Sequence, residues 1–188
     1  MDAERYAIDP GLSRFTVRAF ASGMFSALGH NPTIAIRDFT GEAEFAPDTL
    51  ERAELHLKIR SDSLAVMDDI SDKDRREMES AMKQEVLETA KYPDIVFDSS
   101  NVSASRAGDG HYWINLVGNL SLHGVTSNQA VAAQVALNGD TLRAHGEFSL
   151  RQTAYGIKLV SVAGGALKLK DELKCSFDIV ARKQAHNE

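Results

Sequence analysis

Apolar and polar residues alternate along most of this chain, as they do in strands that bury one face and expose the other. The segment from Ala53 to Ile59 shows this best, because Leu55, Leu57 and Ile59 fall on one side and polar residues on the other. The same alternation predicts strands over residues 15–19, 34–39, 41–45, 95–102, 112–116, 131–137, 142–150, 166–169 and 173–179. The pattern therefore predicts about eight to ten strands.

Turn-forming sequences separate these strands and indicate how they are joined. They occur at residues 9–11, 46–48, 107–110 and 138–140, where Gly, Pro, Asp and Asn concentrate. Short links join antiparallel neighbours. A sheet of this size must form a sandwich or close into a barrel to protect its edges.

One amphipathic helix is predicted from Ser71 to Lys91, where the alternation stops. Apolar residues recur there every four positions, at Met78, Met82 and Val86. Ser71 is placed to cap the first turn, and Tyr92-Pro93 ends the helix. We expect this helix to lie over a barrel mouth or to pack outside the barrel.

Composition narrows the possible functions. The 188 residues, 43% of them hydrophobic, suit one domain spanning residues 1–188. The net charge of −6 with scattered Lys and Arg disfavours nucleic acid and anionic membrane surfaces as partners. The first residues lack the pattern of a signal peptide, so we expect a cytoplasmic protein as written, or a periplasmic one if a leader has been removed.

Several segments, in order, resemble the YceI-like family of lipid-binding barrels. They are residues 6–10 with 13–15, Phe39-Thr40-Gly41, Asp62-Ser63-Leu64, Lys91-Tyr92-Pro93 with the strand that follows, 118–126, and Phe148 through Tyr155-Gly156-Ile157. Each piece is common by itself, and their shared order over about residues 6 to 182 carries the resemblance.

The resemblance implies an all-β fold, an extended antiparallel lipocalin-like β-barrel of about eight strands with one amphipathic helix inserted mid-chain. It also implies that an isoprenoid lipid, such as a polyprenyl phosphate or a quinone tail, binds inside the barrel for carriage, storage or sequestration. A homodimer and transient membrane contact during loading are further expectations. None of these roles calls for a cofactor.

The inward-facing residues of the predicted strands suit an apolar channel. The predicted ligand-binding residues are Phe15, Val17, Leu55, Leu57, Ile59, Phe97, Ile114, Leu116, Leu120, Leu122, Phe148, Leu150, Leu167 and Phe177 inside the barrel, with His30 in a turn. Small residues between them, at Ala19, Ala53, Ala133, Ala144 and Gly146, are expected to leave space. Each buried methylene of a ligand contributes roughly 0.8 kcal/mol, so a tail binds without a charged anchor.

Two other interpretations stay open. An enzyme acting on a lipid-like substrate would use His30 or His123 as acid or base beside an acidic residue. Alternatively, side chains fill the barrel, and the protein works through its outer surface. The sequence favours a binding protein over an enzyme, because nucleophile and phosphate-binding motifs and paired metal-ligand histidines are absent.

Two remaining features are interpreted as structural. Cys175, the only cysteine, alternates with Leu173 and Phe177 and is expected to be a small buried apolar residue. The acidic run from Asp68 to Asp74 lacks the order of a calcium loop and is expected to be a solvated helix start.

Overall fold

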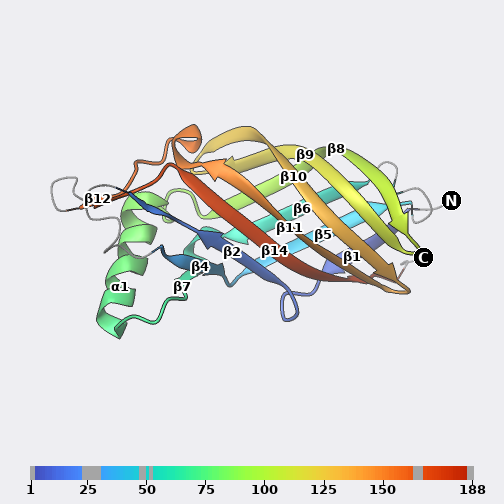
Figure 1. The fold of residues 1–188 in the computed structure, drawn as a ribbon, viewed down its shortest axis with the longest axis horizontal. Coiled ribbons are helices and arrows are strands. Elements are labelled where there is room, and N and C mark those ends of the chain that lie inside the picture. Colours follow the sequence, from blue (N-terminus) through green and yellow to red (C-terminus); the bar gives the residue numbers. More distant parts are fainter. Residues whose placement is uncertain (1–2, 23–30, 47–49, 51–52, 163–166, 186–188) are drawn as a thin grey trace.

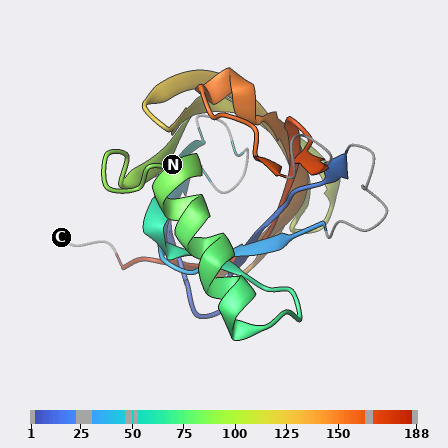
Figure 2. The ribbon, with the colours of Figure 1, turned by 90° about the vertical axis from the view of Figure 1, so that its left-hand side faces the viewer.

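The computed structural model describes residues 3–22, 31–46, 50, 53–162 and 167–185. Strands dominate, and one helix, α1 (Asp72–Ala81), lies at one end of an elongated barrel (Figure 1). Figure 2 looks onto that end and shows α1 crossing one side of the opening. The all-β barrel with a single inserted helix is therefore confirmed.

The strands of the described chain, in order, are β1 (Glu4–Ile8), β2 (Arg14–Arg18), β3 (Ala21–Ser22), β4 (Thr33–Ile36), β5 (Phe39–Phe45), β6 (Glu54–Arg60), β7 (Leu64–Val66), β8 (Asp94–Gly108), β9 (His111–Leu122), β10 (Val125–Asn138), β11 (Thr141–Arg151), β12 (Ser161–Val162), β13 (Leu167–Leu169) and β14 (Glu172–Lys183). Short helical turns are η2 (Ser61–Ser63), η3 (Met82–Val86) and η4 (Gln152–Tyr155).

The barrel closes through antiparallel pairs in the order β1-β5-β6-β8-β9-β10-β11-β14, with β14 returning to β1. The long strand β14 pairs with β1 near its end and with β2 over residues 174–178, so a branch of β2, β4 and β7 extends the wall at one end of the barrel. A separate small sheet joins β12, β13 and β3. Closure leaves the barrel without free edges except along the branch.

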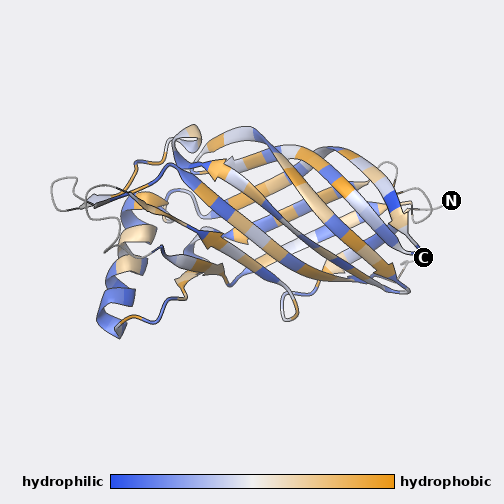
Figure 3. Cartoon of the chain, viewed as in Figure 1, coloured by the Kyte–Doolittle hydropathy of each residue, from blue (hydrophilic) through white to orange (hydrophobic). Residues whose placement is uncertain are grey.

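The alternation predicted from the sequence runs along the long strands (Figure 3). Cross-strand register places Leu57, Phe97 and Leu120 on one inward-facing row. Gly146 lies opposite Phe177, and a Cβ at Gly146 would approach the Phe177 ring within 2.7 Å and the Ala132 carbonyl oxygen within 2.2 Å. Glycine is therefore required where this ring lies against the wall.

The structure corrects several predicted boundaries. The segment 34–39 is split, because β4 ends at Ile36, residues 37–38 are irregular, and Phe39 begins β5. Strands β9 and β10 are longer than predicted and form a hairpin at His123-Gly124. Strands β3, β7 and β12 are too short to show alternation. The predicted turn at 46–48 lies mostly outside the described residues.

The predicted helix is shorter than expected at its end. Ser71 caps it as predicted, since its Oγ accepts a hydrogen bond from the Asp74 amide at 3.1 Å. After Ala81 the backbone widens into the π-helical turn η3, and the regular helix ends well before Lys91. Glu88 then adopts a left-handed backbone (φ 46°), which reverses the chain toward Tyr92.

Candidate functional site

An elongated cavity of about 540 Å³ runs through the barrel. It is lined by the inward faces of the barrel strands and by α1 and η3 at one end, and its wall is overwhelmingly apolar. Cavities that hold small ligands are commonly of this size and character. The alternative in which side chains fill the barrel is therefore wrong.

Most of the predicted ligand-binding residues lie on this wall: Phe15, Val17, Leu55, Leu57, Ile59, Phe97, Ile114, Leu116, Leu120, Leu122, Phe148, Leu150 and Phe177. The side chain of Leu167 and the whole of His30 lie outside the described residues. Of the predicted small residues, Ala19, Ala53, Ala133 and Ala144 line the cavity, whereas Gly146 makes room for the Phe177 ring. Contact with a ligand stays a prediction for all of them.

Sequence reasoning missed part of the wall. The helical segment contributes Met78, Met82, Val86 and Leu87, and the strands add Ile8, Phe45, Ile95, Val131, Val135, Leu142 and Ile179. Apart from Ile8, whose strand was not predicted from alternation, these strand residues lie in predicted strands and fall on their inward face. Alternation extended along the full strands would therefore have found them. The helix residues could not be assigned to the wall from the sequence, because only the structure shows that α1 faces the opening.

One end of the cavity is closed by buried side chains. Tyr6 and Phe45 are 2% and 4% exposed, and their rings stack with centroids 5.0 Å apart. The Tyr6 hydroxyl donates to Glu4 at 3.1 Å, and Lys183 Nζ lies 2.5 Å from the same carboxylate. Burial, followed by the hydrogen bond to Glu4, raises the pKa of Tyr6 to about 12, so this hydroxyl stays neutral.

The opposite end is covered by α1, which is held to the edge strand β7. Val66 donates its amide to Glu79 Oε1 at 2.9 Å, and its carbonyl accepts from Arg75 Nη1 at 2.5 Å. Arg75 and Glu79, one helical turn apart, thus take the place of a neighbouring strand along β7. They fix the helix beside the opening while the helix itself has no buried residue.

His123 fixes the chain after the helix. Its Nε2 lies 2.7 Å from Glu88 Oε2 and its Nδ1 lies 3.2 Å from the Tyr155 carbonyl oxygen. The ring packs on Tyr92 with centroids 4.6 Å apart, and Gly124 has φ 75°, where a Cβ would meet Tyr92 at 2.5 Å. The segments around Tyr92, His123 and Tyr155 therefore meet at one end of the barrel.

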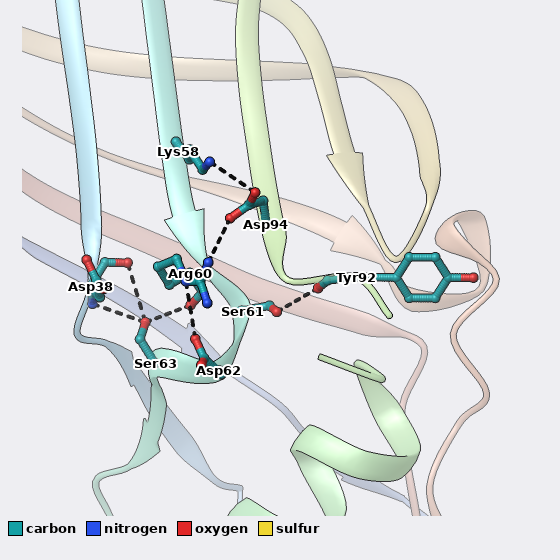
Figure 4. A network of polar contacts seen from close by, with 8 residues as sticks. All are labelled: Asp38, Lys58, Arg60, Ser61, Asp62, Ser63, Tyr92 and Asp94. Atoms are coloured by element: carbon teal, nitrogen blue, oxygen red, sulfur yellow. Dashed lines mark hydrogen bonds and ion pairs between the residues drawn. The ribbon is translucent and has the colours of Figure 1, made fainter. Parts of the chain in front are cut away.

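A polar network continues this attachment at the end of β6 (Figure 4). Ser61, 1% exposed, donates to the Tyr92 carbonyl at 2.7 Å. Ser63 accepts from the Asp38 amide at 3.0 Å and donates to the Arg60 carbonyl at 2.7 Å. Asp94 pairs with Lys58, and its buried Oδ1 has no hydrogen bond but lies 3.6 Å from Arg60 Nη1. The serines at the end of β6 are thus structural.

The chemistry available on the wall is limited. Cys175 lines the cavity, and burial raises the pKa of its thiol to about 12, so it behaves as the apolar residue predicted from the sequence. Gln129 and Gln152 supply amides, and Glu54 and Glu77 supply carboxylates. The wall within the described chain has no Lys, Arg or His. In the same residues no three His, Cys, Asp or Glu side chains gather as metal ligands.

No helix in the described ranges combines the length and apolar character needed to cross a bilayer. His56 and His145 lie on the outer face, His56 within 2.5 Å of Asp98. Neither reaches the cavity wall.

Solved structures share this architecture. Burkholderia cenocepacia BcnA superposes with a TM-score of 0.69 at 20% identity, covering 92% of this chain and 98% of its own. A polyisoprenoid-binding domain from Saccharophagus degradans gives 0.66 at 15%, covering 95% and 98%, and a Campylobacter jejuni YceI protein gives 0.61 at 14%, covering 84% and 88%. These likenesses show the fold.

No sequence among the curated proteins matches this chain. The model of the YceI-like domain, however, matches residues 6–181. The match includes all or part of every strand of the closed barrel and the segments that meet around His123. The chain therefore belongs to the YceI-like domain family.

Proposed function

We propose that this protein binds a long apolar isoprenoid-type lipid, such as a polyprenyl chain or a quinone tail, inside the barrel for carriage, storage or sequestration. The observation that carries the proposal is the elongated cavity with its apolar wall. A hydrocarbon tail gains free energy from every methylene that it places there. The name of the Saccharophagus degradans domain, which states that it binds polyisoprenoid, supports the same class of ligand.

The polar groups on the cavity wall also restrict the charge of the headgroup that a ligand can place inside the barrel. A buried phosphate needs cationic or amide donors, and the described wall carries amides from Gln129 and Gln152 but no cation. Gln152 is 4% exposed and donates Nε2 to the Lys170 carbonyl at 2.9 Å, which leaves its amide oxygen as an acceptor. We therefore expect a neutral headgroup inside, and a phosphate only outside the mouth.

The test is organic extraction of the purified protein, followed by mass spectrometry and by titration with a polyprenol and a quinone. Ala133 faces the cavity and its neighbour Ala132 faces outward, so they form a matched pair. Ala133→Phe should abolish retained lipid and weaken binding at least tenfold, whereas Ala132→Phe should leave both unchanged. Equal binding by the two variants, or an empty barrel without affinity for either lipid, would contradict the proposal.

The alternative of an enzyme has one observation in its favour, the pairing of His123 with Glu88. Both ring nitrogens of His123 are engaged, and the residue is not on the cavity wall. A general acid or base must reach the proton that it transfers. His123→Ala should therefore weaken the attachment of the helix end and abolish no enzymatic activity. If the unmodified protein converts bound lipid and His123→Ala does not, the enzyme interpretation would be supported.

A further inference from the structure

The end of the molecule that carries the cavity mouth also carries exposed large apolar side chains. Met67 follows β7, Met78 lies on α1, Val125 follows the His123-Gly124 turn, and Leu159 precedes β12; they are 49%, 38%, 37% and 39% exposed. Single exposed apolar residues are ordinary on protein surfaces. These four are notable because they belong to segments that lie toward the same end of the barrel (Figure 1).

Lysines accompany the apolar residues on one side of this opening. Lys158, Lys168 and Lys170 are exposed, and none has an ion pair with another described residue. The nearby carboxylate of Asp171 forms an ion pair with Arg151 at 2.9 Å, so its charge is offset by Arg151. The adjacent exposed Glu172 contributes one negative charge against the three lysines. This side of the mouth is therefore locally cationic on a chain whose net charge is −6.

These lysines lie directly beside the cavity wall. Val160 and Leu169 line the cavity, and the Leu169 amide donates to the Val160 carbonyl at 3.0 Å. Their neighbours Leu159 and Lys168 are exposed. The small sheet of β12, β13 and β3 stands at the end of the barrel, apart from α1 across the opening (Figures 1 and 2). The hydrocarbon tail of a lipid that leaves a bilayer beside this sheet would contact the apolar cavity wall directly.

We propose that this rim, defined by Lys158, Leu159, Lys168 and Lys170, docks on the surface of an anionic lipid bilayer and admits lipid between the small sheet and α1. Each lysine near an anionic surface strengthens binding by about fivefold, and Leu159 adds contact with the interfacial region. Helix α1, whose first turn carries Asp72 and Asp74, crosses the other side of the opening (Figure 2). The proposal rests on the proposed lipid-binding function.

The experiment is flotation of the full chain with vesicles of phosphatidylcholine, or of an equal mixture of phosphatidylcholine and phosphatidylglycerol. We expect binding to the anionic vesicles that weakens with salt. Lys158→Gln with Lys168→Gln should lower partitioning by roughly 30-fold. The control, Arg14→Gln with Arg143→Gln, removes the same charge from exposed side-wall positions and should have little effect. Leu159→Ser should weaken binding, and Leu12→Ser should not, although Leu12 is 53% exposed.

Equal losses of vesicle binding in the rim and side-wall variants, or no preference for anionic vesicles, would overturn the proposal that the rim docks on a bilayer. Titration of each variant with detergent-dispersed polyprenol separates this failure from that of the proposed function. Variants that bind dispersed polyprenol normally but no longer float with anionic vesicles support docking. Loss of polyprenol binding by the unmodified protein would overturn the function instead.

Discussion

The two ends of the barrel are built from the same strands but sealed in different ways. Tyr6, Phe45 and Leu50 close one end with side chains that are at most 4% exposed. The Tyr6 and Phe45 rings stack, and the Tyr6 hydroxyl is hydrogen-bonded to Glu4. At the other end α1 has no buried residue and Met78 is 38% exposed, although it lines the cavity. The comparison indicates that the closed end contributes stability and the helix end provides access.

The largest expected effect comes from shortening one side chain at each end of the barrel to alanine. Phe45→Ala should destabilise the protein by about 3–5 kcal/mol, because it leaves a void beside the buried Tyr6 ring. Met78→Ala should cost less than about 1 kcal/mol, since its side chain is partly exposed and its surroundings can adjust. Urea unfolding of both variants in the absence of lipid measures the difference.

Similar losses for Phe45→Ala and Met78→Ala would show that the helix end is packed as firmly as the closed end. The comparison between the two ends would then be wrong. Unchanged m-values are needed to read the two losses as changes in stability.

A second test uses the thiol of Cys175 on the cavity wall. Its pKa of about 12, raised by burial, leaves very little thiolate at pH 8, so alkylation should be about 10³-fold slower than for a free cysteine. Bound lipid should slow it further. Because the chain has one cysteine, mass spectrometry of the alkylated protein reports on this position alone.

The raised pKa of Cys175 also determines how folding stability changes with pH. A thiol whose pKa is higher in the folded protein keeps its proton after the unfolded chain has lost it, so folding stability should fall as pH rises above about 8.5. Cys175→Val should remove this part of the alkaline loss, while the part due to Tyr6 persists up to about pH 12. Fast alkylation at pH 8 would show that the thiol is not buried as described.

The wall of the barrel was predictable from the sequence, and its ends were not. Alternation alone reveals inward residues such as Leu57, Phe97 and Leu120, since strand geometry fixes their face. The ends depend on contacts between distant segments, such as His123 with Glu88, for which no local pattern exists. The resemblance indicated which segments matter, and the structure shows that several of them meet at the helix end.

The smallest predicted effect concerns the attachment of α1. Glu79→Ala removes the acceptor of the Val66 amide and should cost about 1–2 kcal/mol in that local contact. The barrel strands keep their pairing, so the melting temperature should change little. If α1 controls access, release of a bound polyprenol should become roughly five- to thirtyfold faster, as measured by transfer to acceptor vesicles.

Glu85→Ala is the matched control, because Glu85 is exposed on the same helical segment and loses the same charge without losing a contact with another described residue. Faster release in Glu79→Ala but not in Glu85→Ala would assign access to the helix end. The same release rate in both variants would mean that lipid leaves by another path. Because the opposite end is stacked and buried around Tyr6 and Phe45, that path would have to run along the small sheet without depending on the attachment of α1 to β7.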